Sequence, residues 1–149
     1  MRDDPMSRAV VAAPGATGDR LAVLYDGDCG LCTWVAGRLR RWDRQDRLSF
    51  IRLQDVDRLA PPDVARLVRG RRLETELHVV DPATGLVASG GAGVLEIASR
   101  MPGGQLARLA RSAAPARWAT DIGYRIVARN RHRIGRWLRL EGPVCDVPQ

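Results

Sequence analysis

The sequence predicts a single α/β domain with a helical C-terminal region. Two apolar runs of strand length, at 21–25 and 48–53, flank a segment with helical spacing, which makes that segment a crossover between parallel strands. Two further short runs flank the turn at 81–85 and predict a hairpin. From about residue 103 onward, apolar residues recur at helical spacing. Together these patterns predict a sheet with at least one parallel pair and a terminal hairpin.

The first half of the chain contains two predicted strands and two predicted helices. Leu21 to Tyr25 is a continuous apolar run, typical of a central strand buried on both faces. The segment from Gly30 to Arg44 predicts a helix. The stripe expected to face inward consists of Leu31, Val35, Leu39 and Trp42. Leu48 to Leu53 predicts the second strand, and Pro61-Pro62 begins a short helix that carries Val64, Leu67 and Val68.

The second half begins with the predicted hairpin strands, at 74–80 and 86–89. A glycine-rich run follows at 90–93, and then a helix whose inward residues are expected to be Val94, Leu95, Ile97, Ala98 and Met101. Three helical segments complete the chain: Gln105 to Arg111, Pro115 to about Arg131, and a last one with Ile134, Trp137 and Leu138. Residues 1–19 are expected to be a disordered leader, and 20–149 one domain that includes these helices.

A Cys-x-x-Cys pair, Cys29 and Cys32, lies between the first strand and the first helix. A thiol at a helix N-terminus experiences the positive end of the helix dipole, which favours the thiolate that attacks disulfides. The second cysteine lies one helical turn further on, close enough to form an intramolecular disulfide. The sequence therefore predicts a thiol–disulfide oxidoreductase in which Cys29 is the exposed attacking thiol and Cys32 the buried resolving thiol.

Two carboxylates, Asp26 and Asp28, precede the cysteines. A carboxylate beside a thiol opposes its ionisation. Asp26 could instead accept the proton of Cys32 when a mixed disulfide is resolved. The structural alternative is that Asp28 caps the helix and Asp26 accepts hydrogen bonds from turn amides. The cap is the favoured interpretation for Asp28, and both roles stay open for Asp26.

A metal site is the alternative use of the cysteine pair. A structural zinc ion needs four ligands, and the further candidates are Cys145, His78 and His132, none of which form a spaced pair. We therefore predict no metal. Cys145 is a candidate third redox thiol or a buried apolar residue. His78 lies within a predicted strand and His132 between two arginines, so both are predicted to be structural or solvated.

The net charge is +7, and arginine supplies all of the positive side-chain charge, since the sequence contains no lysine. The arginines near the C-terminus, at 125, 129, 131, 133, 136 and 139, lie among Tyr124 and Trp137. This permits a second hypothesis, a binding protein for nucleic acid or an anionic membrane. The favoured interpretation is a solvated helical face whose aromatic residues point into the core, which makes nucleic acid an unlikely partner.

No apolar run approaches the roughly 20 residues that a membrane span requires. The N-terminal apolar run, Ala9 to Ala13, is short, and Asp3 and Asp4 occupy positions where a signal peptide carries positive charge. We therefore expect a cytoplasmic protein, in which a Cys-x-x-Cys pair is more often catalytic than structural.

The chain resembles the DCC family of thiol–disulfide oxidoreductases, named for an Asp-x-x-Cys-x-x-Cys motif. Residues 26–32 carry this motif, preceded by Tyr25 as in the family. Leu53-Gln54, the helix 124–131 and the closing 145–148 segment are also similar. The resemblance implies a thioredoxin-like core, strand–helix–strand–helix–strand–strand–helix, with a helical C-terminal extension. It also implies a redox-active dithiol without a further cofactor, with Tyr25 and Gln54 as supporting residues.

One departure from thioredoxins concerns substrate binding. Thioredoxins carry a cis-proline just before the third core strand, which here falls near Thr75-Glu76. The sequence has no proline between Pro62 and Pro82. A peptide clamp of the thioredoxin kind is therefore not predicted, although protein and small-molecule disulfides both remain candidate substrates.

Overall fold

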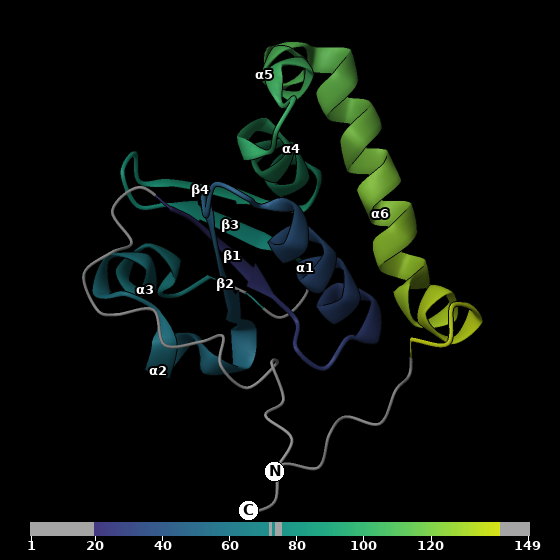
Figure 1. The fold of residues 1–149 in the computed structure, drawn as a ribbon, viewed down its shortest axis with the longest axis horizontal. Helices are drawn as coiled ribbons and strands as arrows, with labels where there is room; N and C mark the ends of the chain where they lie inside the picture. Colours follow the sequence, from purple (N-terminus) through teal and green to yellow (C-terminus); the bar gives the residue numbers. More distant parts are fainter. Residues whose placement is uncertain (1–19, 72, 74–75, 141–149) are drawn as a thin grey trace, which may run out of the picture.

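The computed structural model describes residues 20–71, 73 and 76–140; the predicted leader and Cys145 lie outside this part of the chain. Within it, four strands form one mixed sheet in the order β2-β1-β3-β4 (Figure 1). In chain order, the elements are β1 (Leu21–Tyr25), α1 (Gly30–Trp42), β2 (Leu48–Arg52), the 3-10 turn η1 (Leu53–Asp55), α2 (Val56–Leu59), α3 (Pro62–Val68), β3 (His78–Asp81), β4 (Leu86–Ser89), α4 (Gly90–Arg100), α5 (Gln105–Ser112) and α6 (Ala114–Trp137). The predicted α/β, thioredoxin-like core with a helical C-terminal region is confirmed.

β1 is the central strand, as predicted. It pairs in parallel with β2 and antiparallel with β3. Leu21 to Leu24 are all buried, and successive side chains point to opposite faces of the sheet. Leu21 and Val23 therefore belong to one core cluster, and Ala22 and Leu24 to the other. A strand with two buried faces needs an apolar residue at every position, which explains the unbroken run.

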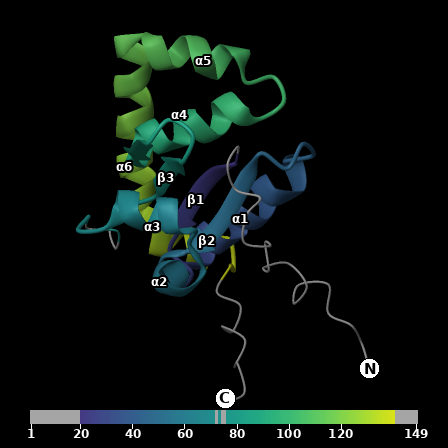
Figure 2. The same ribbon diagram turned by 90° about the vertical axis from the view of Figure 1, so that its left-hand side faces the viewer.

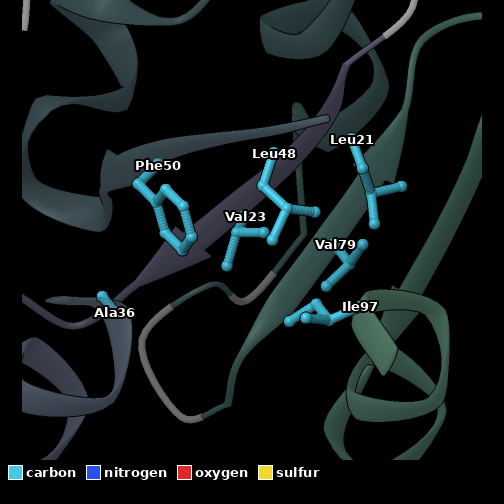
Figure 3. Packing of buried hydrophobic residues seen from close by; sticks show 7 residues of the cluster. All are labelled: Leu21, Val23, Ala36, Leu48, Phe50, Val79 and Ile97. Atoms are coloured by element: carbon cyan, nitrogen blue, oxygen red, sulfur yellow. The ribbon is translucent and has the colours of Figure 1, made fainter. Parts of the chain in front are cut away.

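Helices cover the two faces of the sheet unequally. Ala36 of α1 and Ile97 of α4 pack on the face that carries Val23 (Figure 3). Val56 of α2 and Val64 of α3 pack on the opposite face. Figures 1 and 2 show the sheet between α2 and α3 on one side and α1, α4 and α6 on the other. The three longest helices, α1, α4 and α6, therefore lie on the same side of the sheet, and the cysteine pair is at the start of α1.

The inward stripe predicted for α1 is only partly correct. Ala36 is the buried residue of the helix, whereas Trp42 is 60% exposed and Val35 is 39% exposed. Leu39 packs against the core as predicted. Helical spacing determines which side chains share a stripe, but neighbouring elements determine how much of the stripe is covered.

The hairpin is confirmed, although β3 begins at His78, later than predicted. Its turn is closed by a hydrogen bond from the Gly85 N–H to the Asp81 carbonyl (2.8 Å), with Gly85 at a φ of 72°. The glycine run was expected to precede the next helix. Instead, α4 begins at Gly90 and includes it. The absence of a side chain at Gly91 lets the α6 backbone approach closely, because a Cβ there would lie 2.5 Å from Asp121 Cα.

α6 is one continuous helix and not the two segments predicted. No proline or cap interrupts it between Arg131 and Ile134. Its contacts are chiefly with α4, and it also packs on α1 and α5. After α6, Arg139 adopts a φ of 51° and Leu140 donates to the Gly135 carbonyl (2.9 Å). The chain thus turns back over the start of α1. If Gly30 had a Cβ, it would lie 2.7 Å from the Leu140 carbonyl oxygen.

Candidate dithiol site

Cys29 is the N-cap residue of α1, with extended backbone angles. Its sulfur accepts a hydrogen bond from the Cys32 N–H (3.3 Å) and another from the Cys32 thiol (2.7 Å). The three-residue spacing places the N–H and the thiol of Cys32 within hydrogen-bond distance of the Cys29 sulfur. This sulfur lies at the N-terminus of the helix, where unpaired amides favour negative charge. Within the pair, Cys29 is therefore the hydrogen-bond acceptor and Cys32 the donor.

The exposures of the two cysteines are the reverse of the prediction. Cys29 is 3% exposed, whereas Cys32 is only partly buried. The prediction assumed that the helix N-terminus is open to solvent. The backbone at Leu140 lies against Gly30, so the turn after α6 covers this end of α1. A local pattern around residues 26–32 could not reveal a cover contributed from more than a hundred residues away.

The pKa of Cys32 is raised to about 12. Burial of the thiol is the largest cause, followed by the hydrogen bond and the negative charge of Cys29. The Asp26 carboxylate raises it further, and the Arg131 guanidinium lowers it. At neutral pH, Cys32 is therefore a protonated thiol, as a resolving cysteine is before it reacts.

The two carboxylates and Gln54 form one hydrogen-bonded network beside the cysteines. The Gln54 side-chain amide donates to Asp26 Oδ1 (3.0 Å) and Asp28 Oδ2 (3.1 Å), and its oxygen accepts from the Gly27 N–H (3.1 Å). Asp26 Oδ1 also accepts from the Asp28 N–H (3.0 Å), so it satisfies a turn amide as expected. In this orientation of the Gln54 amide, its NH₂ group faces both carboxylates, whereas the flipped orientation would place its oxygen against them.

The predicted N-cap role of Asp28 is wrong, because Cys29 holds that position and the Asp28 side chain accepts from Gln54 instead. The structure brings Gln54 into the site although it lies 22 positions after Cys32 in the sequence, since β2 runs parallel to β1 and η1 follows directly. Tyr25, the other predicted supporting residue, packs against the first core cluster.

α6 contributes two side chains that the sequence analysis did not assign. Arg131 Nη1 lies 3.5 Å from Asp26 Oδ2. The Tyr124 hydroxyl accepts a hydrogen bond from the Leu77 N–H (2.7 Å). Burial raises the pKa of Tyr124, and the negative charge of Glu76 adds to this effect. Both residues lie in the helix that resembles the DCC family, which was the available signal, but their role depends on where α6 packs.

A cavity of about 210 Å³ opens beside Cys32, between α1, α4 and α6. Its walls are mainly apolar and include Leu31, Val35, Leu39, Val94, Ile97 and Val127. Tyr25 also lines it, and charged groups are contributed by Asp26, Glu76 and Arg131. Val35, Val94 and Val127 are each more than a third exposed, so the cavity opens to solvent.

The remaining sequence candidates lie away from the pair or outside the described residues. His78 is buried in β3, where its Nδ1 lies 2.8 Å from Ser89 Oγ, and His132 is exposed on α6. Over 20–71, 73 and 76–140, no group of three or more His, Cys, Asp or Glu side chains could hold a metal ion. In the same part of the chain, no helix combines the length and hydrophobicity needed to cross a bilayer.

Comparison with known proteins assigns the chain to one family. The sequence profile of the DCC1-like thiol-disulfide oxidoreductase family matches residues 23–137. This range includes the cysteine pair, both carboxylates, Gln54 and all of α6. Neither the curated proteins nor the solved structures contain a significant match. With a dithiol at a helix N-terminus and a profile match over most of its length, the chain belongs to the DCC1-like thiol-disulfide oxidoreductase family.

Proposed function

We propose that the protein exchanges disulfides through Cys29 and Cys32. The observation that supports this most directly is the pair of hydrogen bonds from Cys32 to the Cys29 sulfur at the start of α1. In the reducing direction, the Cys29 thiolate attacks a disulfide R–S–S–R′, forms a mixed disulfide with RS and releases R′S⁻, which takes up a proton. Cys32 then loses its proton and attacks the Cys29 sulfur, which releases RS⁻ and leaves the Cys29–Cys32 disulfide. The dithiol supplies both electrons, so the proposal requires no other redox group.

The second step needs a proton acceptor because burial, the largest cause of the raised pKa of Cys32, still opposes its ionisation in the mixed disulfide. We assign this role to Asp26, whose charge acts on Cys32 and whose carboxylate is held by Gln54 and Arg131. Protonation of Asp26 would remove the negative charge that opposes ionisation of Cys32. Arg131 would then act as a positioning residue, since it lies against the carboxylate and its charge also favours the Cys32 thiolate.

Replacing Asp26 by asparagine is expected to slow resolution of the mixed disulfide by about 10²-fold, because asparagine cannot accept the proton at neutral pH. Stopped-flow measurement of both exchange steps would give the rate. Asp28→Asn is the matched control, since Asp28 shares the Gln54 amide but its charge is not among those that act on Cys32. Equal resolution rates in Asp26→Asn and wild type, with both proteins folded, would remove this role.

A redox titration against defined thiol–disulfide buffers tests the proposed function. Alkylation and mass spectrometry would report the state of each cysteine. A reversible two-electron transition that includes Cys29 and Cys32 is expected, and its potential indicates whether the protein works as reductant or oxidant. If both thiols stay reduced over the whole range, the oxidoreductase proposal fails.

The same titration reports on Cys145, which we propose as a third redox thiol. Leu140 lies against Gly30 at the dithiol site, and the five residues from there to Cys145 can span at most about 18 Å. The dithiol is therefore within reach of Cys145. Oxidation of Cys145 together with the pair would support this role.

The proposal also includes a cytoplasmic, reducing setting, as the sequence led us to expect.

One observation favours a second candidate function, binding of an anionic polymer. Trp137 is 84% exposed and Trp118 is 69% exposed on α6, so the prediction that the aromatic residues point into the core is wrong for Trp137. Arg129, Arg133 and Arg136 are exposed on the same helix. Binding to a DNA or RNA duplex that weakens steeply with added salt would support this function, and no binding at low salt would end it.

A further inference from the structure

The cavity beside Cys32 is built like a small-molecule site. Apolar side chains from α1, α4 and α6 form its walls, and the charged groups Asp26, Glu76 and Arg131 also border it. Ligand sites typically combine a mainly apolar lining with a few placed polar groups. Since Cys32 itself lines the cavity and Cys29 Sγ lies 2.7 Å from Cys32 Sγ, a molecule bound there is next to the dithiol.

The main-chain groups of Leu77, which lines the cavity, are not available to a peptide substrate. The Leu77 N–H donates to the Tyr124 hydroxyl (2.7 Å), and the Leu77 carbonyl accepts from the Gly90 N–H (3.0 Å). A peptide that adds to a strand needs such main-chain groups as partners. Both are already paired within the protein. Side-chain shape and hydrophobicity, rather than main-chain pairing, must then select what binds.

We propose that the cavity is the substrate pocket of the dithiol and takes the apolar, ring-sized group of a small-molecule disulfide. This proposal rests on the proposed function and adds the substrate class to it. A dry apolar cavity of about 150 Å³ holds a benzene molecule. A cavity of about 210 Å³ therefore has room for one ring and a short linker. When the substrate sulfur is bonded to Cys29, its substituent extends past Cys32 into the cavity, and a polar end meets Arg131 or Glu76.

The test compares two uncharged disulfides that differ in one apolar ring, benzyl 2-hydroxyethyl disulfide and bis(2-hydroxyethyl) disulfide. Reduced wild-type protein is expected to have at least about a tenfold higher kcat/KM for the benzyl compound. Val127→Phe fills the cavity from α6 and is expected to reduce this ratio to near one. Ile126→Phe is the matched control, because Ile126 is exposed on the same helix and does not line the cavity. It should keep the wild-type ratio.

A second measurement does not depend on redox chemistry. Benzyl alcohol, which contains no sulfur, is expected to shift the NMR signals of Leu31 and Val35 in wild type and in Ile126→Phe but not in Val127→Phe. Val35→Phe, paired with Trp34→Phe as its control, repeats the comparison on α1 if Val127→Phe does not fold.

The outcomes separate the two proposals. Equal kcat/KM for both disulfides together with no benzyl alcohol shifts would overturn the substrate pocket and leave the exchange function standing. Shifts at the cavity in a protein that reduces neither disulfide would mean that the exchange function fails while the cavity does bind apolar rings.

Discussion

Replacing Cys29 by serine is expected to lower the rate of disulfide reduction by at least about 10²-fold at pH 7. The remaining thiol, Cys32, is a poor nucleophile at that pH, because burial raises its pKa and keeps it protonated. The substitution removes the contributions of Cys29 to this shift but leaves burial, its largest cause. Turnover of a chromogenic disulfide by the purified variant is the measurement.

Replacing Cys32 by serine should have a different effect, which makes it the matched variant. Cys29 would still attack, but no thiol would resolve the mixed disulfide, so a one-to-one adduct between protein and substrate should accumulate. Intact-protein mass spectrometry detects this adduct. If Cys29→Ser reacted and Cys32→Ser were inert, the two roles would be reversed, as the exposures alone suggest, since Cys29 is only 3% exposed.

Replacing Gly91 by alanine is expected to destabilise the fold by about 3 kcal/mol. The new Cβ would lie 2.5 Å from Asp121 Cα and 2.7 Å from the Asp121 nitrogen, which are backbone atoms of α6. Neither can rotate away, so α6 would have to move off α4. Urea unfolding of the variant measures the loss. Because α6 carries Tyr124 and Arg131 to the dithiol site, the exchange rate should also fall.

Gly123→Ala is the control for Gly91→Ala. Gly123 lies within α6, and a Cβ there would meet nothing within 4 Å. Alanine is the better helix former, so this variant should be more stable than wild type by about 0.5–1 kcal/mol. If Gly91→Ala unfolded at the same urea concentration as Gly123→Ala, the close approach of α6 to α4 at Gly91 would not exist in solution.

Local patterns predicted the elements of the sheet well and the coverage of the helices poorly. β1, β2 and the hairpin follow from apolar runs and turn residues, whose effect depends on neighbours within a few positions. Coverage depends on which elements pack nearby. This explains why Trp42 and Trp137 were expected inward and are exposed. The break expected in α6 after Arg131 is absent for a local reason, since no proline or cap lies between Arg131 and Ile134.

The candidate site divides in the same way. The sequence by itself determined the dithiol, its place between β1 and α1, and the adjacent carboxylates, because three-residue spacing at a helix start brings the two sulfurs together whatever surrounds them. The resemblance to the DCC family added Gln54. Only the tertiary structure decided that Arg131 pairs with Asp26, that Leu140 covers the start of α1, and that an apolar cavity opens beside Cys32. Burial and charge at a site come from elements that are distant in the chain and adjacent in space, and local spacing carries no information about that adjacency.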